Sequence, residues 1–60
     1  MKEKRQLYVG DFVKLNMEYA PTMRIEKILG RRVFCLWFDK SHRPHEKTFM
    51  IEEVFLVAKK

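Results

Sequence analysis

The chain has 60 residues, enough for one small domain, and 47% of them are hydrophobic, which is too many for a disordered segment. Its single cysteine excludes an internal disulfide framework, and its longest apolar run, residues 33–38, is far shorter than the ~20 residues that a membrane helix needs. Thirteen Lys and Arg against eight Asp and Glu give a net charge of +5, which attracts polyanions such as nucleic acid but also occurs in proteins that need only solubility. No charged and apolar leader opens the chain, so we expect a cytoplasmic protein with no membrane partner.

Alternating apolar residues predict short strands in the first half of the chain. The first strand, 12–16, follows Gly10, which permits a turn. A loop is expected over 17–21, because its proline lacks a backbone donor. Apolar and polar residues alternate along the segment 22–29 until the alternation shifts by one residue, which predicts a bulge near 26–27. A helix over this segment is the alternative, but its β-branched residues favour a strand.

Turn-forming and polar residues divide the second half in the same way. Gly30 predicts a hairpin tip, since glycine tolerates positive φ. The elements expected after it are a strand at 32–38, a hairpin loop at 39–45, a strand at 46–50, one helical turn at 51–53 and a strand at 54–58. Five short strands joined by turns predict an all-β fold, a small five-stranded antiparallel barrel. We expect a flexible basic N-terminus over 1–7 and one domain over 8–60.

Three segments, in order, match a family pattern, and Phe49 follows them. They are Val9-Gly10-Asp11-Phe12-Val13-Lys14-Leu15, then Pro21-Thr22-Met23-Arg24-Ile25, then Val33-Phe34-Cys35-Leu36-Trp37-Phe38. The chain resembles the YodC-like family of small, largely uncharacterised bacterial proteins over roughly residues 9–56. The family has a Gly-Asp-x-Val-x-Leu opening, a Pro-x-Met-x-Val strand and a Cys-x-Trp-Phe strand. The resemblance implies an SH3-like barrel and a bacterial or phage origin, and very little about function.

Two departures from the family pattern bear on function. Relatives usually have a glycine pair before the proline, whereas this chain has Glu18-Tyr19-Ala20 in a loop about one residue longer. The conformation of that loop is therefore not carried over from the family. The position between the cysteine and the tryptophan is usually polar, and here it is Leu36. Leu36 is the more informative departure, because it adds an apolar side chain where relatives have none.

The sequence offers no catalytic or metal-binding constellation. Cys35 lies in the most apolar strand, and a buried thiol is inert. His42 and His45 lie in a polar loop, where Pro44 excludes the regular helix that would align them as metal ligands. The chain has only two glycines, twenty residues apart, so it has no phosphate-binding loop. We predict a protein that is not an enzyme, with no cofactor, no metal and no small-molecule substrate.

The strand at 32–38 is apolar on both faces. Val33, Cys35 and Trp37 share one face, which we assign to the core, while Phe34 and Leu36 share the other. If Trp37 is a core residue, Trp37→Ala costs roughly 3–5 kcal/mol. A strand that is apolar on both faces is usually covered on both.

Two interpretations account for the second face. In one, the N-terminal segment folds over it through Leu7 and Tyr8. In the other, it is an exposed apolar surface for a protein partner or a second copy of the chain. The candidate interface residues are then Phe12, Phe34 and Leu36. Phe38 is expected to turn inward at a bend of the strand, to match the Trp-Phe pair of the family.

Basic residues interleaved with aromatic ones predict, as a competing function, binding of single-stranded nucleic acid. Bases stack on aromatic rings while cations follow the phosphate backbone. The candidate phosphate contacts are Arg24, Arg31, Arg32, Lys40, Arg43 and Lys47, and the candidate stacking residues are Tyr8 and Tyr19, with Phe12 and Phe34. We expect Arg24 and Lys47 to flank Phe34 on the outer surface. The alternative is that these charges are solvated residues on hairpin tips.

Overall fold

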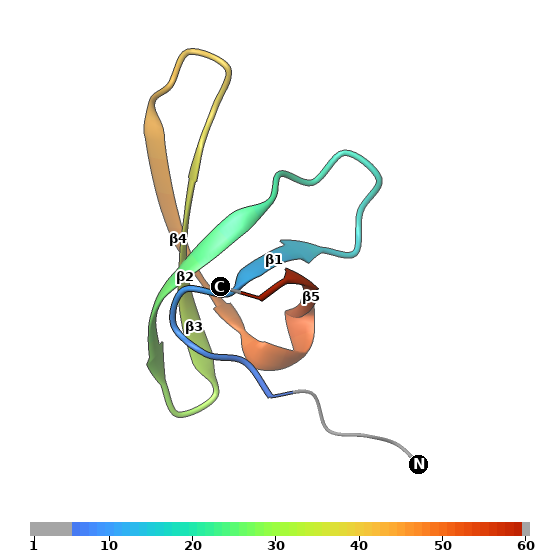
Figure 1. Cartoon of the computed structure of the whole chain (residues 1–60), viewed down its shortest axis with the longest axis vertical. Helices are drawn as coiled ribbons and strands as arrows, with labels where there is room; N and C mark the ends of the chain where they lie inside the picture. The colour runs from blue at the N-terminus through green and yellow to red at the C-terminus, as the bar shows by residue number, and fades with distance from the viewer. Residues whose placement is uncertain (1–5, 60) are drawn as a thin grey trace.

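The computed structural model describes residues 6–59 as a single antiparallel sheet (Figure 1). Its elements are β1 (Phe12–Leu15), β2 (Met23–Leu29), β3 (Arg32–Phe38), β4 (Pro44–Met50), the 3-10 turn η1 (Ile51–Glu53) and β5 (Val54–Ala58). The strand order is β4-β3-β2-β1-β5, and all neighbours are antiparallel. The predicted all-β fold is confirmed. No ladder in this part of the chain joins β4 to β5, so closure into a barrel stays a prediction. None of the described residues forms a helix that is long and apolar enough to cross a membrane.

The local signals in the sequence are confirmed at most element boundaries. Gly10 and Gly30 have φ angles of 98° and 61°, in the left-handed region that glycine tolerates. The pairing of β2 with β3 shifts register between Ile25 and Lys27, which is the predicted bulge, and the helix alternative for this segment is wrong. β3, η1 and β5 have their predicted bounds.

β4 begins at Pro44, two residues before the predicted start, because the hairpin loop is shorter than expected. The carboxylate of Asp39 closes this loop: Oδ1 accepts hydrogen bonds from the backbone N–H of Ser41 at 2.8 Å and of Arg43 at 3.0 Å. His42 takes a left-handed φ of 64° at the tip. Proline is tolerated at the start of β4, since this strand forms one edge of the sheet.

The core lies on one side of the sheet, where side chains from all five strands meet. It consists of Val13, Met23, Ile25, Val33, Cys35, Phe49 and Val54. Leu7 packs against this cluster, on the face of β3 opposite to Phe34 and Leu36. Leu7 therefore does not cover the second face of β3. The basic residues 1–5 of the expected flexible N-terminus lie outside the described residues.

The β3–β4 hairpin projects beyond the other strands (Figure 1), so Trp37 lies on the core face, as predicted, but is not enclosed there, and the predicted inward turn of Phe38 is wrong. Trp37 is only half-buried at the margin of the core, where its ring stacks on His45 with the centroids 5.5 Å apart. Phe38 is 59% exposed and does not turn inward. Phe38 points to the side away from the core because β3 keeps alternating to its end, and Trp37 is half-buried because the hairpin has extended past β1 and β5 there.

Candidate interaction surface

A row of paired residues crosses the sheet on the side away from the core. The register joins Phe12 to Arg24, Arg24 to Leu36, and Leu36 to Glu46. Directly paired residues share one face, and successive residues of a strand alternate between faces. Because Cys35 is buried in the core, Leu36 and its whole row lie on the opposite side, which we call the outer face.

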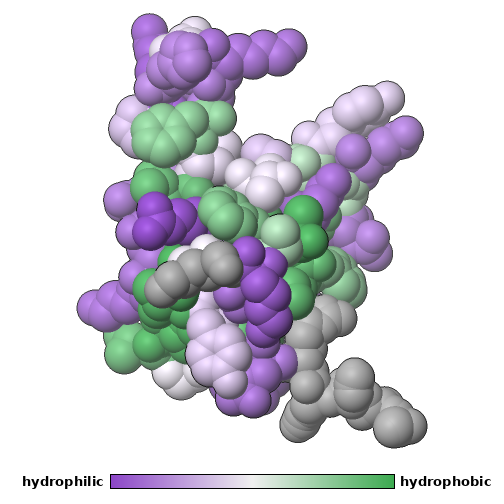
Figure 2. Space-filling model, in the orientation of Figure 1, coloured by the Kyte–Doolittle hydropathy of each residue, from purple (hydrophilic) through white to green (hydrophobic). Residues whose placement is uncertain are grey.

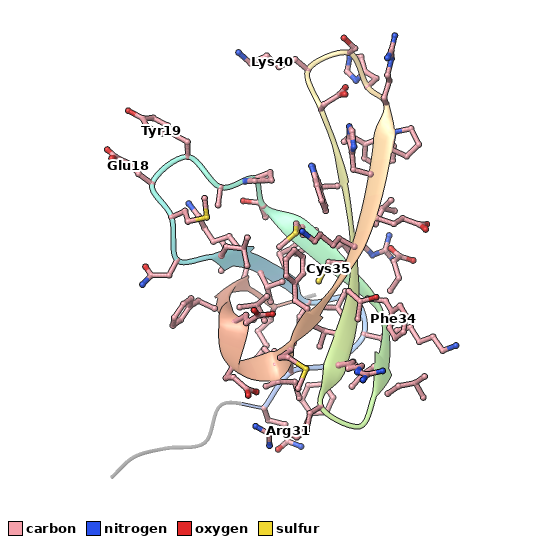
Figure 3. All side chains as sticks on the ribbon, turned by 180° about the vertical axis from the view of Figure 1, so that it is seen from behind. Glu18, Tyr19, Arg31, Phe34, Cys35 and Lys40 are labelled. Carbon is pink, nitrogen blue, oxygen red and sulfur yellow. The ribbon has the colours of Figure 1, made fainter. Side chains whose placement is uncertain are left out.

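β3 contributes an apolar column to the outer face. Phe34, Leu36 and Phe38 alternate along this strand with the inward-facing residues, and Figure 3 shows Phe34 and Cys35 on opposite sides of β3. Phe34 and Leu36 are half-buried, because neighbouring side chains shield them. Lys27 lies beside the column, with its Nζ 5.6 Å from the centroid of the Phe34 ring.

Two grooves run along this column. The groove between the end of the β1–β2 loop and the projecting hairpin has a volume of about 240 Å³ and is lined by Phe12, Thr22, Arg24, Leu36, Trp37 and Phe38. The second has a volume of about 460 Å³ and is lined by Glu26, Lys27, Phe34, Cys35, Glu46, Lys47 and Thr48. In the view of Figure 2, hydrophilic side chains cover the two loop tips, and hydrophobic side chains lie among hydrophilic ones over the strands below them. The first groove combines an apolar lining with one cation, as binding sites for amphipathic partners do.

Arg24 is the cation at the centre of the first groove. Its Nε lies 3.6 Å from Oε2 of Glu26, and the two side chains are 56% and 42% exposed. Exposed ion pairs at this distance contribute little to stability and exchange readily. The guanidinium of Arg24 is therefore available to a carboxylate of a partner.

The predicted nucleic-acid contacts do not form one surface. Lys40 lies at the hairpin tip, at the same end of the molecule as Tyr19, which is 90% exposed, whereas Arg31 lies at the opposite end (Figure 3). Arg31 also holds η1 against the β2–β3 turn. Its Nη2 donates to Oε1 of Glu52 at 2.9 Å, and its carbonyl accepts a hydrogen bond from Ile51 N.

The remaining candidates are dispersed as well. Arg32 is exposed at the start of β3, Arg43 lies in the hairpin loop, and Tyr8 lies under Lys59, whose Nζ is 5.2 Å from the ring centroid. The prediction for Lys47 is wrong. Lys47 pairs with Cys35 on the core side of β4, where its Nζ lies 5.6 Å from the Phe49 ring.

Phe34 is instead flanked across the sheet by Lys27 and Thr48. The bulge in β2 places Lys27 there, because an unbroken ladder from Arg24 and Ile25 would pair Phe34 with Glu26. Thr48 is placed there by the register of the β3–β4 hairpin.

Cys35 and the two histidines do not come together as a reactive pair. Burial raises the pKa of the Cys35 thiol to about 11, so the reactive thiolate is strongly disfavoured. His45 Nε2 donates to Oδ2 of Asp39 at 2.9 Å, and His42 lies at the turn of the hairpin. Within residues 6–59 no group of three or more His, Cys, Asp or Glu side chains is placed to hold a metal ion.

Comparison of the chain with family models, with curated proteins and with solved structures finds no match. The resemblance to the YodC-like family therefore stays an interpretation of the three sequence motifs.

Glu46 completes the outer row but is not among the residues predicted from the sequence, because its partner on β3 depends on the length of the hairpin loop. A loop of five residues, 39–43, closed by the carboxylate of Asp39 pairs Phe38 with Pro44. Counting two residues further along each strand then pairs Leu36 with Glu46.

Proposed function

We propose that this protein is a non-enzymatic interaction module that docks a protein partner on its outer face. The observation that carries the proposal is the apolar column Phe34, Leu36 and Phe38, which borders two grooves and shares its central row with Phe12 and Arg24. Contiguous apolar surface of this kind is characteristic of protein-interaction sites. A cation within it gives a partner a polar anchor, as arginine does at the centres of many interfaces.

The charge distribution favours a protein partner over nucleic acid at this face. Residues 6–59 contain nine Lys and Arg against seven Asp and Glu, a net charge of +2. The other +3 of the chain's charge belongs to residues 1–5 and Lys60. Binding to nucleic acid depends on neutralising phosphates, whereas the outer face carries Glu26 and Glu46 beside its cations.

Site-specific crosslinking tests the proposal in cells that produce the protein. A photoreactive phenylalanine analogue at position 38, which is 59% exposed, is expected to form an adduct with protein. Leu36→Lys is expected to remove this adduct while the purified variant keeps the circular dichroism spectrum of the folded wild type. The same analogue at position 18, in the β1–β2 loop, is the control. The absence of a protein adduct at position 38, or an adduct that Leu36→Lys leaves unchanged, would contradict the proposal.

A second candidate function is binding of single-stranded nucleic acid at the end of the molecule that holds the hairpin tip. Lys40 and Arg43 in the β3–β4 loop and the exposed Tyr19 lie at this end, and the combination of cations and an aromatic ring supports the candidate. Fluorescence anisotropy with a labelled mixed-sequence oligonucleotide tests it.

Binding is expected to weaken steeply with salt and to be lost in the Lys40→Ala, Arg43→Ala double variant. The Arg31→Ala, Arg32→Ala variant is the matched control, because it removes the same charge at the opposite end. Equal losses in the two variants, or no binding at low salt, would exclude a site at the hairpin end.

A further inference from the structure

We propose that the occupant of the outer face is a second copy of this chain, docked face to face about a two-fold axis parallel to β3. This inference rests on the proposed function and names its partner. The central row of the outer face carries the argument, since its charges and its apolar residue are arranged symmetrically about β3.

Leu36 lies on β3, between Arg24 on β2 and Glu46 on β4. Neighbouring strands are spaced by about 4.8 Å, so the two opposite charges lie at similar distances on either side of Leu36. A two-fold rotation about an axis along β3, applied to a copy stacked on this face, exchanges the two sides of the row. Arg24 of each copy then lies over Glu46 of the other, and the two Leu36 side chains meet on the axis.

The neighbouring row is compatible with the same operation. Phe34 meets its own counterpart, and Lys27 on β2 faces Thr48 on β4 of the other copy, so this row opposes no like charges. At the start of β3 the two exposed Arg32 side chains meet at the end of the seam. The apolar column thus forms a continuous seam between two sheets, which in stacked sheets are about 10 Å apart.

The charges also favour this orientation over the other two-fold arrangement of the same two faces. A two-fold axis in the same plane but perpendicular to β3 keeps each strand over its own counterpart. It therefore places Arg24 over Arg24 and Glu46 over Glu46. Opposed like charges disfavour that arrangement, so the row specifies one relative orientation of the two sheets. A polyanion is disfavoured on the same row, since its phosphates would lie beside Glu46.

Sedimentation velocity on charge-reversal variants tests the arrangement. Arg24→Glu places two carboxylates at each intermolecular pair, and Glu46→Arg places two guanidinium groups there. Each single variant is expected to dimerise at least about tenfold more weakly than the wild type. The Arg24→Glu, Glu46→Arg double variant restores both pairs and is expected to recover the dimer. An equimolar mixture of the two single variants is also expected to dimerise, because each mixed pair again joins opposite charges.

Lys40→Glu is the control, since it makes the same change of charge at the hairpin tip, away from the proposed seam. Arg24 and Glu46 are exposed, so their variants are expected to fold, which circular dichroism verifies. A wild-type protein that stays monomeric at all concentrations overturns the inference, and so does a failure of the mixture to recover the dimer. A protein adduct at position 38 that depends on Leu36 would still support the proposed function in either case, with a different partner.

Discussion

The two faces of β3 have almost the same composition and different surroundings. Val33 and Cys35 on the inner face are 0% and 1% exposed, whereas Phe34 and Leu36 on the outer face are half-buried. The inner face meets the side chains of the four other strands. The outer face borders two open grooves. The same strand therefore supplies stability on one side and a surface available for binding on the other.

The burial of side chains on the inner face of β3 changes along the length of the strand. Near its start, the inner residue Val33 is enclosed and pairs with the buried Phe49. Near its end, the inner residue Trp37 is half-buried and stacks on His45 within the hairpin. Burial on the inner face thus depends on how far the other strands extend, and not only on which way a side chain points.

Substitution of one phenylalanine on each side of the sheet gives the largest expected contrast. Phe49→Ala removes a buried core ring and is expected to cost about 3–5 kcal/mol, which matches the whole stability expected of so small a core. This variant is expected to be largely unfolded at 25 °C. Phe34→Ala is expected to cost about 1–2 kcal/mol, because its ring is half-buried and contacts Lys27 from outside. Urea unfolding followed by circular dichroism measures both. Equal losses would mean that the outer face is as enclosed as the core.

The reactivity of Cys35 tests the enclosure of the inner face directly. With its pKa raised to about 11, the thiol at pH 8 holds about 100-fold less thiolate than an unperturbed cysteine. Alkylation by iodoacetamide, followed by mass spectrometry, is expected to be slower by at least this factor in the folded protein than in urea. Phe34→Ala, whose change lies on the outer face, is expected to raise the slow rate only in proportion to the unfolded population that its loss of stability adds. Rapid alkylation of the native protein would show that the inner face opens readily.

The fold was largely predictable from the sequence because its signals are local. Gly30 fixes a turn, the slip in alternation fixes the bulge, and the run from Val54 to Ala58 fixes the last strand. Each depends on residues adjacent in the chain. The sorting of β3 into two faces is local as well, since it follows from the period of two.

The candidate surface was less predictable because it depends on register between strands. The bulge moves Lys27 beside Phe34, and the Asp39 turn sets β4 so that Lys47 lies opposite Cys35 and Glu46 opposite Leu36. A one-residue error in either feature exchanges the faces of a whole strand. The half-burial of Trp37 was also inaccessible, since it depends on how far the hairpin projects beyond β1 and β5.

Acid provides the smallest and most local perturbation, because it acts on the hairpin that carries the end of β3. The hydrogen bond from His45, and then that from the amide of Arg43, hold the pKa of Asp39 below its usual value. A carboxyl whose pKa is lower in the folded state stabilises the fold above its unfolded pKa, about 3.9, and this stabilisation is lost as the pH falls through the folded value. Asp39→Asn is therefore expected to lower the thermal midpoint slightly at pH 7 and to reduce its fall between pH 7 and pH 3.

Trp37, the only tryptophan, stacks on His45 and reports this change by its fluorescence. Glu52→Gln is the matched control. The pKa of Glu52 is also lowered, first by its own backbone amide and then by Arg31, but it lies beside the β2–β3 turn at the other end of β3. Loss of the Glu52 carboxylate is expected to change how the thermal midpoint depends on pH without altering the fluorescence of Trp37 at pH 7. If Asp39→Asn gives the acid profile and fluorescence of the wild type, the Asp39–His45 contact does not hold the projecting hairpin in place. The pairing of β3 with β4 and the stack of Trp37 on His45 would then suffice to hold the wall of the outer groove at Phe38.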